Sequence, residues 1–257
     1  MIARNQGGDG RVRAVHRTNE RGRDKAAYIA LFVFLALVAT QVARLGASGL
    51  LVQLGQFEID RWEAKSRSPD KEELKRSAQF FADSLSYVSD NPWALEAAGA
   101  LDLAKMRGSR VPREALAATK SAYARIRQAL IQRPTSPFLW ANLALTKLYL
   151  NEIDGELRAA LRHADELGPW EPTVQQTVLF VGLAVWRDLD PELRHTLVRT
   201  IERGASRNPQ KMFEVVKSHR RFDLICAIRK YEVIAGSDCK NAAAASSGNA
   251  LKQGQRP

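Results

Sequence analysis

The chain has 257 residues, enough for one medium-sized domain with appendages, and 45% of them are hydrophobic, as in an ordinary globular protein. Its formal net charge of +11 favours anionic partners but says nothing about the fold. Two cysteines are too few for a disulfide-dense scaffold, and without a C-x-x-C pair they do not predict a structural zinc site.

An apolar segment close to the N-terminus dominates the hydropathy pattern. Residues 26–43 carry no charge. As a helix they would be roughly 27 Å long, close to the ~30 Å thickness of a bilayer core. Soluble helices rarely stay apolar on all faces over such a length, so a buried core helix is the weaker alternative. The segment therefore predicts a transmembrane helix.

The flanks of this segment predict its orientation. Seven basic and three acidic side chains stand among residues 1–25. The positive-inside rule places this tail in the cytoplasm and the rest of a single-pass inner-membrane protein in the periplasm. A cleaved signal peptide is the alternative, but the long apolar run and the lack of a convincing A-x-A site favour an uncleaved anchor. Composition predicts disordered tails at residues 1–25 and 240–257.

Residues 44–68 carry an apolar stripe beyond the transmembrane segment, through Leu45, Leu50 and Phe57. Between Arg44 and Glu58 no charged residue interrupts it. We expect a juxtamembrane helix that either runs on into the soluble part or lies along the membrane surface.

Residues 69–239 show long helical patterns and no convincing strand, which predicts an all-α fold. Prolines recur every 35–42 residues, at Pro92, Pro134, Pro169 and Pro209. The segments before them carry small or apolar residues at i, i+4 and i+7, so we take the prolines to close helices. This spacing is typical of helix–turn–helix repeats. An irregular helical bundle is the alternative.

The first helix of the middle repeat fits a tetratricopeptide (TPR) pattern. Trp140, Leu143 and Ala144 occupy the W-x-x-L-small positions of such a helix, and its two neighbours fit more loosely. We therefore expect a TPR-like α-solenoid of about three helical hairpins. A lone helix near residues 70–89 would precede it, and one or two helices within 210–235 would follow.

The sequence resembles the VpsP-like family of small membrane-anchored proteins found with exopolysaccharide biosynthesis systems. The similar segments are LWANLAL at residues 139–145 and the run at 157–186, of which LGPWEPTVQ at 167–175 is the most specific piece. The pattern around Cys226 and Cys239 is also similar. TPR segments of O-antigen-ligase-type polymerases carry similar helices. The resemblance implies an accessory role in making, polymerising or exporting a polysaccharide, and it carries over no catalytic residues.

No residue pattern points to catalysis. The four histidines lack the spacing of HExxH, HxxxH or Cys/His sites, so we expect no metal and no cofactor. Carboxylates such as Glu152, Asp154 and Glu156 are spaced like a solvated helix surface and not like the facing pair of a glycosidase. We expect a protein that is not an enzyme.

The GPWEP segment has a structural and a functional interpretation. Structurally, Gly168 would take the left-handed conformation that ends a helix, and Trp170 would pack between hairpins. Glu171 would cap or form a salt bridge, and Pro172 would open the next helix. Functionally, Trp170 and Glu171 would belong to a surface that contacts a partner. With Trp140 they are the candidate interaction or structural motif.

Cys226 and Cys239 stand thirteen residues apart. In an oxidising periplasm they can form a disulfide that pins the last helix against the C-terminal loop. Closing a loop of this size contributes roughly 3 kcal/mol on the chain-entropy model.

The leading functional interpretation is a non-catalytic, membrane-anchored scaffold that assists polysaccharide biosynthesis, polymerisation or export. A solenoid would present an extended surface to membrane proteins of that machinery. Basic clusters at residues 194–207 and 217–221 would meet anionic lipid headgroups or acidic glycan there, and no nucleic acid. The alternatives are a lid that binds the growing glycan and an envelope-assembly TPR adaptor without a polysaccharide role.

Overall fold

The computed structural model describes residues 9–64, 70–226 and 239 of the chain. Throughout these residues the regular structure is helical, without strands, in agreement with the predicted all-α class. The α-helices are α1 (Asp9–Ala64), α2 (Lys71–Tyr87), α3 (Pro92–Gly108), α4 (Pro112–Gln132), α5 (Pro137–Tyr149), α6 (Gly155–Leu167), α7 (Pro172–Ala184), α8 (Pro191–Arg207) and α9 (Pro209–Ser218). Two short 3-10 helices, η1 (Trp186–Asp188) and η2 (Phe222–Leu224), complete the order.

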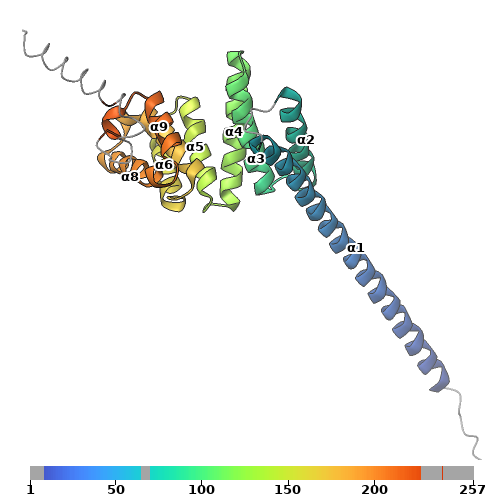
Figure 1. Cartoon of the computed structure of the whole chain (residues 1–257). Coiled ribbons are helices and arrows are strands. Elements are labelled where there is room, and N and C mark those ends of the chain that lie inside the picture. Colours follow the sequence, from blue (N-terminus) through green and yellow to red (C-terminus); the bar gives the residue numbers. More distant parts are fainter. Residues whose placement is uncertain (1–8, 65–69, 227–238, 240–257) are drawn as a thin grey trace, which may run out of the picture.

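Helix α1 is a single long rod that leaves the helical domain on one side (Figure 1). Its segment Lys25–Trp62 is long and apolar enough to cross a membrane, and no part of the most apolar stretch of this segment is buried. The predicted disorder of residues 1–25 is wrong for residues 9–25, since α1 begins at Asp9. No proline interrupts this stretch, and extending a formed helix avoids a second costly nucleation. The tails 1–8 and 240–257 lie outside the described residues.

The predicted juxtamembrane helix is the continuation of α1, which runs without a break to Ala64 and packs along α2. A Cβ on Gly55 would lie 2.6 Å from the Phe81 ring, so the glycine allows the two helices to approach closely. Ser48 and Ser84 share a buried hydrogen bond of 2.8 Å between their hydroxyls. The helix expected to stand alone near residues 70–89 therefore belongs to a hairpin with α1.

Three further hairpins follow, α3/α4, α5/α6 and α7/α8, at the places where the sequence predicts them. Successive first helices pack on one another, because α5 contacts both α3 and α7, and α7 contacts α9. One apolar core runs from Leu95 of α3 to Leu197 of α8. A second cluster, around Ile201 and Phe213, joins α8 to α9. Within 210–235, the described residues hold most of α9 and η2, while residues 227–238 lie outside them.

Of the four recurring prolines, two open helices and two directly follow helix ends. Pro92 and Pro209 stand at the first helical positions of α3 and α9, where a missing N–H costs nothing. Pro134 and Pro169 lie in the turns that precede α5 and α7. Pro172 opens α7, as predicted. Pro134 and Pro169 follow the C-caps of α4 and α6, as predicted, whereas the prediction that Pro92 and Pro209 close helices is wrong.

Candidate functional site

A groove lies between α2, α3 and α4, with a cavity volume of about 940 Å³. Its floor and walls are small or aliphatic side chains from α2 and α3, namely Leu74, Ala78, Ala82, Ala98, Leu101 and Ala104. Short side chains on facing helices leave the space between them open. The turn from α3 to α4, at Gly108–Val111, lines one end.

Charged side chains surround this groove. Asp102 is 5% exposed, and its carboxylate accepts hydrogen bonds from the Ser121 hydroxyl at 2.7 Å and the Lys105 ammonium at 3.2 Å. The Arg125 guanidinium lies 3.4 Å from the same carboxylate. These contacts compensate the burial of the charge and fix α3 to α4. Glu114 lies at the rim, where it accepts a bond from Ser109.

The volume of the groove is in the range of sites that hold side chains or small ligands. Its lining is about half apolar, and the groove is open to solvent on one side. In the parts of the chain that the structure describes, no group of three or more His, Cys, Asp and Glu residues could hold a metal ion.

None of the sequence-predicted site residues lines this groove. It was missed because its lining consists of alanines and aliphatic residues that, read in sequence, look like ordinary helix surface. The signal that could have found it is the set of small side chains at Ala78, Ala82 and Ala98, on two helices that are consecutive in the sequence.

A second polar cluster lies at the turn from α5 to α6. The Lys147 side chain is 3% exposed, and its ammonium lies 2.7 Å from Glu152, 2.7 Å from Asp154 and 3.1 Å from Glu156. The Tyr123 hydroxyl of α4 donates to Glu156 at 2.9 Å. These carboxylates therefore converge on one buried cation, although Glu152 and Asp154 stay about half exposed to solvent.

The same contacts set the ionisation of the cluster. Burial lowers the pKa of Lys147, but its hydrogen bonds to the three carboxylates outweigh burial and raise the pKa above its usual value. The hydrogen bond from Lys147 lowers the pKa of Asp154. Burial raises the pKa of Glu156, yet hydrogen bonds from Lys147 and Tyr123 leave it below the usual value. The cluster is thus a charged structural joint between α4, α5 and α6.

Trp140 lies half-buried on the first turns of α5. Its ring Nε1–H donates to the Pro134 carbonyl at 2.7 Å, and its ring centroid lies 4.6 Å from that of His163 on α6. These contacts hold the turn before α5 and the α5/α6 pair together. They account for Trp140 as a structural residue.

Trp170 does not pack between hairpins, because it is 51% exposed. The Arg207 guanidinium lies over its ring, 5.4 Å from the ring centroid. Glu171 stands at the N-cap of α7, and its side chain makes no capping bond. Gly168 has φ −131°, so it is not left-handed as predicted. Trp140 and Trp170 thus have different ring partners, His163 and Arg207.

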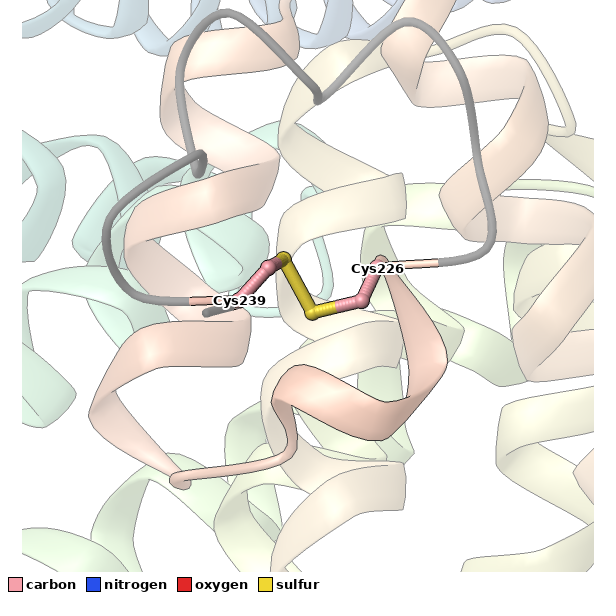
Figure 2. Close-up of a disulfide and its surroundings, with 2 residues drawn as sticks. All are labelled: Cys226 and Cys239. Carbon is pink, nitrogen blue, oxygen red and sulfur yellow. A yellow bond between two sulfur atoms is a disulfide. The ribbon is translucent and has the colours of Figure 1, made fainter. Parts of the chain in front are cut away.

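Cys226 and Cys239 are joined by a disulfide, with their Cα atoms 5.6 Å apart (Figure 2). Cys239 packs against the apolar cluster of α8 and α9. The bridge therefore ties a residue beyond η2 to the last part of the helical domain.

The described residues define an all-helical protein of stacked hairpins with a long apolar N-terminal helix and a disulfide. No family model matches the chain, and no curated protein does. Among solved structures, PilF of Pseudomonas aeruginosa is similar at 13% identity and a TM-score of 0.35, over 79% of this chain and 99% of that chain. At this TM-score the similarity carries no inference about function. The VpsP-like resemblance stays a prediction.

Proposed function

We propose that this protein is a non-catalytic, membrane-anchored scaffold that holds a protein partner in the groove between α2, α3 and α4. The observation that carries the proposal is the groove itself, which has an open, half-apolar lining and a volume of about 940 Å³. Anchoring one partner at the membrane raises its effective concentration for others in the same membrane.

Two features support an extracytoplasmic place for the helical domain. The basic N-terminal flank of the apolar helix favours the cytoplasm for the tail and the periplasm for the domain. The disulfide between Cys226 and Cys239 suits an oxidising compartment. The proposed location is therefore the inner membrane, with a periplasmic domain.

The process that the scaffold serves is proposed from the sequence resemblance alone. That resemblance points to the synthesis, polymerisation or export of a polysaccharide, with membrane proteins of that machinery as partners. An envelope-assembly adaptor without a polysaccharide role has the same fold requirements. A deletion mutant with normal polysaccharide output would reject the polysaccharide process and leave the scaffold proposal standing.

The groove can be tested by photo-crosslinking in intact membranes. A photoreactive amino acid at Gln79, which lines the groove, is expected to capture a discrete partner that mass spectrometry identifies. The same amino acid at Glu192, exposed at the start of α8, is the control. Equal capture at both positions, or none at Gln79, would contradict the groove as the binding site.

A second candidate function, a lid that binds an anionic glycan, is favoured by the charges around the groove. Its lining includes four basic residues, Lys75, Lys105, Arg110 and Arg125, and two acidic ones, Asp102 and Glu114. Binding through these charges would weaken steeply with salt, whereas docking on the apolar floor would not. Titration of the purified chain with an acidic polysaccharide at low and high salt separates the two.

A further inference from the structure

The helices alternate in direction, so the turns α2–α3, α4–α5, α6–α7 and α8–α9 share one edge of the hairpin stack. Side-chain contacts between consecutive turns show that these turns lie next to one another. The Gln132 side chain at the end of α4 donates to the Asp90 carbonyl before α3. Arg207 at the end of α8 donates to the Trp170 carbonyl at 3.3 Å. We call residues 87–93, 131–138, 167–171 and 207–209 the anchor-side edge.

This edge begins where the apolar segment 26–43 of α1 ends. The Arg44 guanidinium donates to the Tyr87 carbonyl at 2.8 Å, and the Asn91 amide donates to the Ser48 hydroxyl at 2.8 Å. At ~1.5 Å per residue, Ser48 lies about 8 Å beyond the end of that segment. The headgroup layer on each side of a bilayer is about 5–8 Å thick. The α2–α3 turn is therefore level with the headgroups when residues 26–43 span the membrane.

Exposed apolar side chains gather on the same edge. Outside α1, the described part of the chain has nine large hydrophobic residues that are well exposed. Six lie on the anchor-side edge: Tyr87, Trp93, Ile131, Phe138, Leu167 and Trp170. All four aromatic residues of the nine are among these six. Tyrosine and tryptophan are the residues enriched where membrane proteins cross the membrane–water interface.

An arginine accompanies each exposed tryptophan. The Arg133 guanidinium lies 3.5 Å from the Trp93 ring centroid and also pairs with Glu96, and Arg207 lies over Trp170. Arginine can keep its charge at the phosphate level while its stem covers apolar surface. Acidic residues such as Asp90 and Glu171 stand on the edge too, so net charge is not what would attract it to a membrane. The attraction would come from its aromatic and aliphatic side chains.

We propose that the anchor-side edge rests on the bilayer that α1 crosses, with Trp93 and Trp170 inserted at the interface. This rests on the anchor in the proposed function and adds a second contact with the membrane. The hairpin stack then lies along the membrane surface. The groove extends to the α3–α4 turn at Gly108–Val111, which lies on the opposite edge. It therefore stays open to a periplasmic partner.

The test is tryptophan fluorescence of the full chain in nanodiscs of phosphatidylethanolamine and phosphatidylglycerol, with part of the lipid brominated near the headgroup. We expect bromine to quench the wild-type signal. Because both rings stand exposed on the anchor-side edge, Trp93→Phe and Trp170→Phe should each reduce the quenched signal, and the double variant should reduce it further. The control is Trp186→Phe, since Trp186 lies in the α7–α8 turn on the opposite edge. That variant should leave the quenched signal unchanged.

Equal loss of quenching in all three variants, or no quenching in the wild type, would overturn the proposal. Carbonate extraction of cell membranes that contain the chain tests the anchor separately. A chain that resists extraction but shows no bromine quenching has its anchor and lacks the edge contact. A chain that is extracted refutes both. Crosslinking at Gln79 is independent of either result.

Discussion

The Cβ position of Gly168 lies 2.6 Å from the Cβ of Pro137, so the end of α6 rests directly on the first turn of α5. Gly168 has φ −131°, a conformation that any residue adopts. What requires glycine here is therefore the space and not the backbone angle. The contact closes the α5/α6 hairpin at the anchor-side edge, one residue before Pro169 and two before Trp170.

Gly168→Ala should destabilise the domain. The proline ring cannot rotate away, so the added methyl forces a shift of the backbone, and overpacking of this kind costs about 1–3 kcal/mol. We expect thermal unfolding, followed by circular dichroism in detergent, at a midpoint several degrees lower. Gly155→Ala at the start of α6 is the matched control, because a Cβ there meets nothing within 4 Å. An unchanged midpoint in Gly168→Ala would show that the turn can relax.

Lys147→Met should also destabilise the domain, because it leaves the carboxylates of Glu152, Asp154 and Glu156 facing one another around an apolar chain. Their ammonium partner is 3% exposed, while the carboxylates are partly solvated. Solvent therefore screens part of the loss, and we expect about 2 kcal/mol. Urea unfolding measures this loss in the free energy of unfolding. Lys120→Met, on the exposed side of α4, should change little.

The pKa shifts predict how the stability difference between wild type and Lys147→Met depends on pH. The pKa values of Asp154 and Glu156 are lowered in the folded protein, so their contribution is present above pH ~4.5 and is lost as the pH falls through the folded values. The pKa of Lys147 is raised, so its contribution is present below pH ~10 and is lost above. The difference between wild type and Lys147→Met should therefore be largest between about pH 5 and 10. A difference that stays constant down to pH 3 would contradict the cluster.

Much of the fold could be predicted because it depends on local patterns. The uncharged run at 26–43, the periodic apolar residues and the spacing of the prolines are properties of short segments, and they placed the three hairpins. Pro92 and Pro209 were assigned to the wrong side of their turns, because a proline next to a helix end is equally consistent with N1 of the next helix. The capping side chains of Asn91 and Asn208, directly before these prolines, are the residues that resolve this.

The candidate sites were harder to predict because they depend on contacts between helices. Lys147 and Glu156 are on different helices, and only the turn at Asn151, with φ 58°, brings their charges together. The alanines of the groove carry no chemical signature of their own. Trp170 looked like a core residue by its size, but the space between α6 and α7 is filled by smaller side chains such as Val174 and Leu161.

Trp140→Phe should cost more stability than Trp170→Phe. The first change removes the 2.7 Å hydrogen bond from the indole to the Pro134 carbonyl, worth about 1 kcal/mol. The second alters a ring that is 51% exposed, so we expect a change close to zero. Urea unfolding of both variants provides the comparison. A larger loss in Trp170→Phe would mean that Trp170 packs against more of the domain than Arg207.

Removal of the disulfide should loosen the C-terminal end of the domain and leave its beginning intact. The bridge spans thirteen residues, so the double variant Cys226→Ser/Cys239→Ser should lose roughly 3 kcal/mol on the chain-entropy model. Hydrogen exchange should speed up in α9 and η2, which lie beside the bridge, and stay unchanged in α3 and α4. Mass spectrometry of non-reduced protein from membranes should find the two cysteines linked. Two free thiols would contradict the oxidising location.

Orientation in the membrane is the prediction on which the location of the scaffold depends. Seven basic residues precede the apolar segment 26–43, and only Arg44 follows it before residue 58. The positive-inside rule therefore predicts that alkaline phosphatase, which needs oxidising conditions, is active when fused after residue 226, and that a cytoplasmic fluorescent reporter fused there is dark. Replacing Arg11, Arg13, Arg17, Arg21 and Arg23 with glutamine should weaken this preference, since it removes most of the charge bias. A fusion active only in the cytoplasm would place the groove, the disulfide and the anchor-side edge on the other side of the membrane.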